Sequence, residues 1–544
     1  MKIIGASIGT CIHVAGLLNF LDLCKAEGHT AKFLGSAISP EGLMRFIKEE
    51  SPDLVAISYR LDPEVAGRLF EQIKAKIREN DISGTRIVFG GTPAVAETAR
   101  KSGLFERVFE GAEPLDEIKA YLKGETSYKG EEAFPQDLVS RINKSYPFPI
   151  LRHHFGLPSV KDTVEGASLI AQSGVLDVLS LGPDQNAQES FFRPDEMKPG
   201  QDGAGGVPLR KPEDLRAIYD AARRGNYPLL RCYSGTRDLI KWAEMLKETI
   251  NIAWGAVPLC WYSELDGRSD RPIRDAIKEN QEAIRWYAGR GIPVEVNESH
   301  QWSLRNAHDS LAVAMAFLAA YNAKKLGARY YVSQYMFNTP PGTSPAMDLG
   351  KMLAKIELIE GLHDDNFTSF RQVRAGLASF LPDMDIAKGQ LAASGLLSLA
   401  LKPHILHVVG YCEAHHIVSP GELIESCKII RGMAHNSLDD FPDMTNDSRV
   451  QRRKKELVKE AGILLSALKE LGKGSGNPWS DPEVIARAIE TGLLDAPHLK
   501  KNPCAKGGIA TMIIDGKCCA VNGKTGKIIS EKARMDSLRG KINE

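Results

Sequence analysis

The nine cysteines of this 544-residue chain are spaced in none of the patterns that predict a zinc knuckle or a disulfide framework. In particular, there is no Cys-x-x-x-Cys-x-x-Cys triplet, which excludes the enzymes that generate radicals with an iron–sulfur cluster held by that motif. The chain also has no excess of either charge, with 69 Lys and Arg against 69 Asp and Glu. We therefore expect it to bind neither nucleic acid nor an anionic membrane surface.

No apolar run approaches the ~18 residues of a membrane-spanning helix, and the sequence opens on a strand pattern without the features of a leader. We therefore expect a cytoplasmic protein. No internal repeat is seen, and the length predicts several domains or one large barrel with additions. With 43% hydrophobic residues, the chain can form large buried cores.

Three loops near the amino terminus are expected to meet at one edge of a parallel sheet. The segment Cys11-Ile12-His13-Val14-Ala15-Gly16 follows an expected strand at 2–7, Ser58 follows one at 54–57, and Gly90-Gly91-Thr92 follow one at 86–89. The carboxyl edge of such a sheet is where ligands bind in doubly wound α/β domains. A lone histidine there is more often a capping residue than a ligand, but three such loops at one edge favour a ligand site.

With His-x-x-Gly, the serine and the Gly-Gly pair in this order, residues 1–122 resemble the cobalamin-binding domain of B12-dependent mutases and methyltransferases. The resemblance implies a flavodoxin-like doubly wound fold. In it the nucleotide tail of the corrinoid enters the sheet edge, and His13 becomes the lower ligand of cobalt. Ser58 would hydrogen-bond the tail, and the glycines would leave room for it. The implied cofactor-binding residues are Cys11, His13, Gly16, Ser58, Gly90, Gly91 and Thr92.

One position departs from that family. The family has Asp two residues before the histidine, where its carboxylate orients the ring and raises its basicity. Here the position is Cys11, and a thiol is a weak acceptor. Two outcomes stay open: His13 binds cobalt more weakly than in the family, or the cofactor binds by its tail alone.

The rest of the chain is expected to form a barrel and an extension. Residues 123–149, rich in Gly, Lys, Glu, Ser and Pro, are expected to be a linker. Between 150 and 446, apolar strand patterns alternate with amphipathic helices, which favours a TIM (β/α)8 barrel over a second open sheet. The expected strands are 175–181, 227–232, 252–259, 293–296, 329–333 and 404–409. Residues 447–544 form a helical, Gly- and Cys-containing carboxyl-terminal extension.

From about residue 150 to 500 the chain resembles the barrel subunit of glutamate mutase, also called methylaspartate mutase. The likeness rests on the order of several segments behind a cobalamin-binding domain: Asp177-Val178-Leu179-Ser180, 234–238, Glu413-Ala414, 468–474 and 488–495. The chain therefore looks like both subunits of that enzyme fused. In the family three arginines clamp the two substrate carboxylates, a task that suits bidentate donors.

The three clamp positions fall on His154, Gln188 and Tyr233, none of which forms a charged fork. Only Glu413 is retained, and the resemblance places it on the adenosyl ribose. We therefore expect a substrate other than glutamate, and a less charged one, because Tyr233, Trp261 and Tyr262 would line the mouth. The candidate catalytic residues are His154, Arg231, Tyr233 and Glu413.

Further polar residues lie around the expected mouth, each with a structural role as the plainer interpretation. Arg152 and His153 precede or begin the first barrel unit, and others end or follow expected strands: Cys232, Glu264, Asn297, Glu298, His300 and Tyr411. The neighbouring His415 and His416 do not predict a metal site, because two residues on one loop rarely bind one ion without a third ligand. Cobalt held by His13 is the only metal that we expect.

The leading interpretation is an enzyme, an adenosylcobalamin-dependent carbon-skeleton isomerase (mutase) that acts by radical rearrangement on a small molecule. The alternative is a corrinoid-binding protein without mutase activity, such as a methyl carrier or a B12-responsive module. The lost clamp and the missing orienting Asp favour the alternative, whereas the full barrel and Glu413 favour the isomerase. A third interpretation is a flavodoxin-like domain that binds no cobalamin. The oligomeric state stays open, a homodimer included.

Overall fold

The computed structural model describes residues 1–82, 84–111, 113, 118–119, 121–122, 134–233, 235–437 and 442–542. The chain divides into two compact units, residues 1–129 and 130–544. Residues 123–133 of the expected linker, and Ser234, lie outside the described residues.

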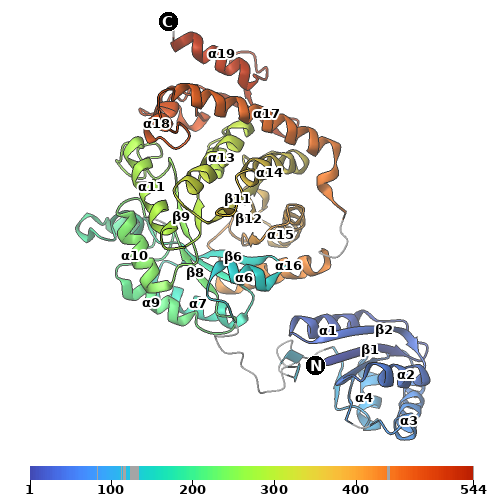
Figure 1. Ribbon diagram of the computed structural model, residues 1–544. Coiled ribbons are helices and arrows are strands. Elements are labelled where there is room, and N and C mark those ends of the chain that lie inside the picture. The colour runs from blue at the N-terminus through green and yellow to red at the C-terminus, as the bar shows by residue number, and fades with distance from the viewer. Residues whose placement is uncertain are drawn as a thin grey trace. The chain divides into compact units, whose positions relative to one another are not determined.

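The first unit is a doubly wound α/β domain with a five-stranded parallel sheet in the order β2-β1-β3-β4-β5 (Figure 1). Its strands are β1 (Lys2–Ile8), β2 (Thr30–Ile38), β3 (Leu54–Ser58), β4 (Arg86–Gly90) and β5 (Arg107–Phe109). Its helices are α1 (Ala15–Ala26), α2 (Pro40–Glu50), α3 (Pro63–Glu79) and α4 (Pro93–Ser102). Side chains alternate along each strand, so both faces are covered. Ile4 packs in the core that includes α2, α3 and α4, whereas Ile3 packs against α1.

The second unit contains an eight-stranded parallel sheet in the order β8-β7-β6-β13-β12-β11-β10-β9. The strands are β6 (Ile150–Phe155), β7 (Val178–Leu181), β8 (Leu229–Cys232), β9 (Gly255–Val257), β10 (Val294–Val296), β11 (Tyr330–Phe337), β12 (Thr368–Ala375) and β13 (Ile405–His407). At the two ends of this order, Ala253 N donates to Leu230 O at 2.8 Å, which closes the sheet between β8 and the start of β9. The predicted fold class, a doubly wound domain followed by a (β/α)8 barrel, is confirmed.

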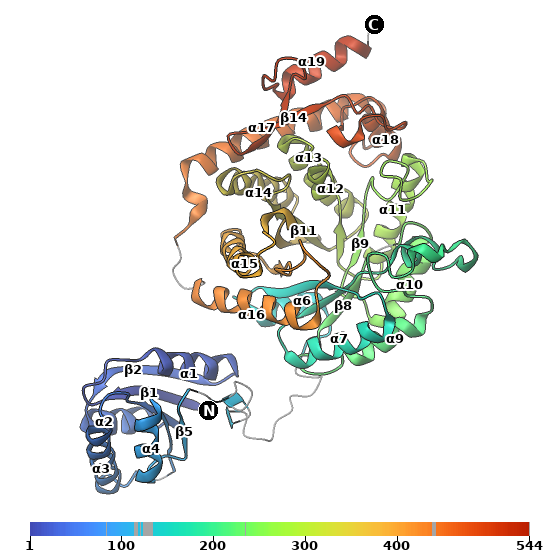
Figure 2. The same ribbon diagram turned by 180° about the vertical axis from the view of Figure 1, so that it is seen from behind.

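Helices surround this barrel (Figure 2). They are α6 (Leu138–Ser145), α7 (Val160–Ser173), α8 (Gln185–Ser190), α9 (Pro212–Ala221), α10 (Leu239–Ile250), α11 (Ile273–Ala288), α12 (Ser299–Leu304), α13 (Asp309–Lys325), α14 (Pro345–Glu360), α15 (Met384–Leu399) and α16 (Pro420–Ser437). Helix α6 lies in the segment expected to be a linker. Its Leu138 and Ile142 pack in one cluster with Ile150, Leu229 and other residues at the amino ends of the strands. The helix therefore covers the end of the barrel opposite the mouth.

Two barrel strands, β6 and β12, were not among the six strands expected from the sequence. Both carry polar side chains toward the lumen: Arg152 and His154 on β6, and Gln372 and Arg374 on β12. Because inward positions of a strand are normally apolar, these residues removed the pattern by which a buried strand is recognised. Each of the two missed strands thus contributes two polar side chains to the lumen.

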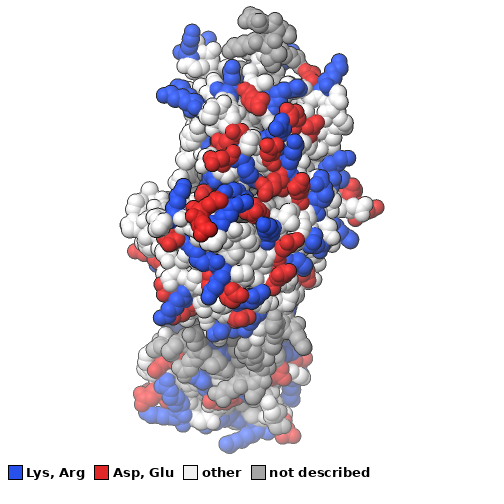
Figure 3. Space-filling model, turned by 90° about the vertical axis from the view of Figure 1, so that its left-hand side faces the viewer, with Lys and Arg blue, Asp and Glu red and all other residues white. Residues whose placement is uncertain are grey.

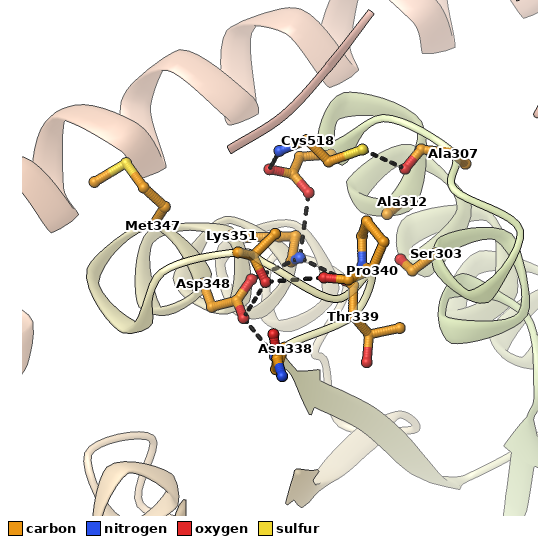
Figure 4. Close-up of polar contacts among 12 residues, drawn as sticks. Ser303, Ala307, Ala312, Asn338, Thr339, Pro340, Met347, Asp348, Lys351 and Cys518 are labelled. Atoms are coloured by element: carbon orange, nitrogen blue, oxygen red, sulfur yellow. Dashed lines mark hydrogen bonds and ion pairs between the residues drawn. The ribbon is translucent and has the colours of Figure 1, made fainter. Parts of the chain in front are cut away.

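The carboxyl-terminal extension belongs to the same compact unit as the barrel. It contains α17 (Ser448–Leu471), α18 (Pro482–Glu490), the hairpin of β14 (Ala510–Ile514) and β15 (Lys517–Val521), and α19 (Glu531–Ile542). A buried ionic cluster joins it to the barrel (Figure 4). Lys351 Nζ lies 2.7 Å from Asp348 and 3.2 Å from Asp309, which in turn contacts Arg453 of α17 at 2.7 Å and the Cys518 backbone N–H of β15 at 3.1 Å.

Acidic and basic side chains are interspersed on the molecular face drawn in Figure 3, without a large area of one sign. This agrees with the equal numbers of positive and negative residues in the sequence. Within the described part of the chain, every helix is too short or too polar to cross a membrane.

Candidate functional site

The loop after β1 is held in place by its backbone. Gly9 turns the chain with a φ of +66°. The carbonyl of Cys11 accepts hydrogen bonds from Ser7 Oγ at 2.5 Å and from Ala37 N at 3.1 Å, which ties the loop to the end of β2. His13 is left exposed, and Ile12 beside it is 68% exposed.

The buried thiol of Cys11 lies beside the His13 ring. Its Sγ is 3.9 Å from His13 Nδ1, at the limit of a hydrogen bond to sulfur. Nδ1 therefore faces the protein, which leaves Nε2 to reach a ligand outside the loop. The sulfur stands where an orienting acceptor is needed, but it is a weak one.

An unpaired hydroxyl and two glycines lie at the same sheet edge. The Oγ of Ser58 is buried and has no hydrogen-bond partner among the described residues. A Cβ placed on Gly16 or on Gly90 would meet no described atom within 4 Å. A donor that needs an acceptor, next to open space, fits the nucleotide tail that the sequence predicts there.

Two other predicted cofactor-binding residues serve the loop after β4. A Cβ on Gly91 would lie 2.6 Å from the carbonyl oxygen of Tyr59, so the loop itself requires glycine. Thr92 is the N-cap residue of α4 in extended conformation, and its side chain makes no cap hydrogen bond. The loop backbone thus needs Gly91, and of the two glycines Gly90 faces open space; that they leave room for the cofactor stays a prediction.

In the second unit, Arg152 of β6 anchors a polar network inside the barrel. Its guanidinium donates to Ser180 Oγ at 2.7 Å and lies 2.9 Å from His407 Nδ1 and 2.8 Å from His154 Nε2. His154 Nε2 is also 2.5 Å from the Tyr233 hydroxyl, and the two rings stack with centroids 4.7 Å apart. Two of the predicted catalytic residues are therefore in direct contact.

Arg231, a third predicted catalytic residue, lies under the Tyr233 ring, with its guanidinium carbon 4.5 Å from the ring centroid. Its Nη2 donates to Glu295 Oε1 at 3.1 Å, and both side chains are fully buried. The Glu295 carboxylate also accepts from Trp254 Nε1 at 2.6 Å and from Gln334. The other two nitrogens of the guanidinium, Nε and Nη1, have no partner among the described residues.

The charge of this lumen is positive. Burial, and then the charge of Arg152, hold the pKa values of His154 and His407 well below the usual range, so both rings are neutral. Burial also lowers the pKa of Arg152, but only to about 10. Arg374 lies two residues beyond Gln372 on β12, so it faces the lumen as well; its Nε and Nη2 are 3.3 Å from Met336 Sδ.

Three arginines, Arg152, Arg231 and Arg374, thus face the lumen; Arg231 pairs with Glu295, and the charge of Arg374 acts on Glu413. Of the aromatic residues expected at the mouth, Tyr233 does contact His154 and Arg231, whereas Trp261 is fully buried against Trp302, with ring centroids 4.9 Å apart. The lumen therefore holds more charged side chains than the expected aromatic lining, because the inward polar residues of β6 and β12 were not recognised as facing it. A substrate less charged than glutamate stays a prediction.

Glu413, the fourth predicted catalytic residue, lies on the loop after β13 and is separate from the other three, His154, Arg231 and Tyr233. Its Oε1 accepts from Gly410 N at 2.6 Å and lies 2.9 Å from His153 Nε2. Burial raises the pKa of its carboxyl, but these interactions outweigh burial and keep the pKa below its usual value. No hydrogen bond or ion pair joins Glu413 to His154, Arg231 or Tyr233 within the described chain.

Several lumen residues were missed from the sequence: Glu295, Gln334, Gln372, Arg374 and His407. One signal could have identified some of them. Glu295 interrupts the buried strand Val-Glu-Val, and His407 interrupts an apolar strand in the same way. A single polar residue at an inward position of a buried strand marks a lumen group, provided that the strand itself is recognised.

These features define a cobalamin-binding domain joined to an α/β barrel. Residues 1–119 match the family model of the B12 binding domain. A cobalamin-binding protein from Desulfitobacterium hafniense DCB-2 is similar at 19% identity over 22% of this chain and 57% of that one, with a TM-score of 0.20. The cobalamin-dependent S-adenosylmethionine radical enzyme OxsB is similar at 12% identity over 91% of this chain and 71% of that one, with a TM-score of 0.18. The chain matches no curated protein. The family match therefore assigns cobalamin binding to the first unit.

Proposed function

We propose that this protein is an adenosylcobalamin-dependent isomerase that rearranges the carbon skeleton of a small carboxylate other than glutamate. The observation that carries the proposal is a buried, positively charged barrel lumen with unpaired donors, in a chain that begins with a cobalamin-binding domain. Cobalamin supplies the radical chemistry when bound. The residues of the chain bind the two ligands, orient them and exclude water.

On the cofactor side, His13 would ligate cobalt through Nε2, since Nδ1 faces the Cys11 sulfur. The Ser58 hydroxyl would donate to the nucleotide tail, and the absent side chains of Gly16 and Gly90 would leave space for it. The buried thiol at residue 11 makes ligation weaker than a carboxylate would.

On the substrate side, Arg231 would hold a carboxylate. Its unpartnered Nε–H and Nη1–H groups point to opposite sides of the planar guanidinium, so each can donate a separate hydrogen bond to a ligand oxygen. The bond to Glu295 and the Tyr233 ring fix the orientation of the guanidinium. Without an anionic ligand, the three lumen arginines would keep an uncompensated charge in the barrel.

His154, Tyr233 and Glu413 would complete the site. The neutral His154 ring takes a hydrogen bond from Arg152 at Nε2, and its Nδ1 carries a hydrogen without a partner, available to the substrate. The Tyr233 hydroxyl lies 2.5 Å from Nε2. Glu413 is ionised and one of its oxygens is already bonded, so the other can accept from a sugar hydroxyl of the cofactor.

One observation favours a second function, a corrinoid-binding protein without isomerase activity. Of the three positions where glutamate mutase has arginines, Gln188 is bonded to the Pro183 carbonyl at 2.8 Å, and His154 and Tyr233 are bonded to each other. None of the three is free to form a clamp. This function would need the cofactor site but not the Arg231 donors.

The test combines cofactor spectra and substrate binding. We expect the absorption spectrum of bound adenosylcobalamin to change in His13→Ala, and a panel of small carboxylates to give product with the wild type but not with Arg231→Gln. Glutamate should not be converted. Retention of adenosyl-, methyl- and hydroxocobalamin without turnover of any carboxylate would support the second function, and an unchanged His13→Ala spectrum would remove His13 as the ligand.

A further inference from the structure

The loop between β13 and α16 brings together three side chains that can bind a metal ion. The Cys412 sulfur, a His416 nitrogen and a Glu422 carboxylate oxygen all lie within 4.8 Å of one another. From these contacts we propose that Cys412, His416 and Glu422 form a zinc site, which is independent of cobalamin and of the proposed function. From the sequence only the neighbouring His415 and His416 were considered as ligands. The fold brings Cys412 and Glu422 next to His416.

The backbone explains why these residues converge. The Cys412 carbonyl accepts from His415 N at 2.8 Å and from His416 N at 2.9 Å, so this part of the loop is a single helical turn. Residues four apart on such a turn lie on the same face, which places the Cys412 sulfur and the His416 ring side by side. Glu422 reaches back from the first turn of α16, where it pairs with Ser419 in a capping box.

The ligand types fit Zn²⁺. Thiolate, imidazole and carboxylate are its usual ligands, and three protein ligands plus a water make a complete tetrahedral site. Ligand atoms of such a site lie roughly 3–4 Å apart. His416 Nε2 is already 2.8 Å from Glu422 Oε1, so only a shift of about 1 Å toward the sulfur is needed. The side chains of His416 and Glu422 are 43% and 24% exposed and can make it, with the water on the solvent side.

The surrounding groups support this assignment. His416 Nδ1 lies 3.0 Å from His415 Nδ1, so a metal on Nε2 would leave Nδ1–H to donate to His415. Zinc binding would release the Cys412 proton to solvent, and the ion would supply the positive charge that a buried thiolate needs.

A simpler explanation exists for part of the cluster. The capping box accounts for Glu422, and a surface hydrogen bond accounts for His416. Neither accounts for the buried Cys412, so variants at this residue separate a zinc site from a capped helix. A zinc ion would also fix the loop that carries Glu413, the residue next to Cys412.

The experiment is zinc titration of the reduced, metal-free full chain against a chromophoric chelator. We expect one tight equivalent in the wild type, and affinity lower by at least about 100-fold in Cys412→Ser and His416→Ala. Glu422→Gln keeps the capping box and should lose about 10-fold or more. Cys504→Ser, a half-buried cysteine outside the loop, is the matched control and should bind like the wild type.

Circular dichroism and tryptophan fluorescence, which reports on the barrel unit, establish that each variant folds. If Cys412→Ser does not fold, His416→Ala still tests the proposal, because His416 lies on the surface. Absence of a tight equivalent in the wild type would overturn the proposal. So would equal zinc affinity in the wild type and in His416→Ala.

Discussion

The cofactor edge of the first unit and the lumen of the second unit are both polar, but they are built differently. At the edge, the exposed His13 lies on the loop after β1, and the buried Cys11 and Ser58 lie beside it and at the end of β3, where Gly16 and Gly90 border open space. In the lumen, Arg152 and Arg231 lie within strands, fully buried, and bond across the barrel to residues far away in the sequence. Changes at the edge should therefore affect binding, whereas changes in the lumen should affect stability as well.

Among the variants that test this difference, Arg231→Met is expected to have the largest effect. It leaves the Glu295 carboxylate buried without its ionic partner, and we expect the barrel to lose about 3–5 kcal/mol of unfolding free energy. All six tryptophans lie in the second unit, so urea unfolding followed by tryptophan fluorescence reports on the barrel. Cobalamin binding should not change. Arg231→Met with Glu295→Gln should regain part of the stability, and a loss below about 1 kcal/mol would contradict the buried pair.

Part of the difference between the cofactor edge and the lumen was predictable from the sequence. Loops that follow strands directly are local features, so His13, Ser58 and Gly90 could be assigned to one edge. The lumen depends on which residues of eight strands face inward. The network around Glu295 joins residues up to 77 positions apart, and it could not be assembled while β12 was unrecognised.

The different roles of two adjacent glycines could not be predicted from the sequence either. Gly90 and Gly91 are adjacent and identical in type, yet one faces open space and the other touches a carbonyl oxygen. Likewise, nothing in the sequence of α14 distinguishes Lys351, which has two carboxylate partners, from Lys355 one turn later.

Lys355→Met tests whether every buried cation of the barrel unit is stabilising. Lys355 is 2% exposed and forms no ion pair within the described chain. Burial, and then the charge of Lys351, lower its pKa from 10.5 to about 7. We expect Lys355→Met to stabilise the barrel by roughly 2–4 kcal/mol at pH 7, measured by the same urea unfolding.

The change of unfolding free energy with pH tests the same prediction, because its sign follows from the lowered pKa of Lys355. Between pH 7 and 10.5 the unfolded chain binds more protons at Lys355 than the folded one, so wild-type stability should rise with pH in that window. The rise should be absent in Lys355→Met. Lys351→Met is the opposite control: it removes the partner of Asp309 and Asp348 and should destabilise.

The adjacent glycines give a matched pair within the first unit. Gly91→Ala places a methyl group against the Tyr59 carbonyl oxygen, and we expect a loss of about 1–3 kcal/mol, seen by calorimetry of the full chain. Gly90→Ala should leave the melting temperature unchanged and lower cobalamin affinity, because its methyl group enters the open space of the cofactor edge. Equal effects of the two variants on both measurements would show that the edge is not a separate binding surface.

The smallest expected effect sharpens the comparison most, because it concerns one atom beside His13. Cys11→Asp replaces a sulfur 3.9 Å from Nδ1 by a carboxylate, which accepts far better from an imidazole N–H. We expect cobalamin to bind a few-fold tighter, measured by equilibrium titration, with a shift in the cofactor spectrum. The position is fully buried, so an unpaired carboxylate would also cost stability. Cys11→Ser, which keeps the size and the neutral charge, is the control for that cost. If Cys11→Asp binds cobalamin no better than Cys11→Ser does, the weak sulfur contact does not limit ligation by His13.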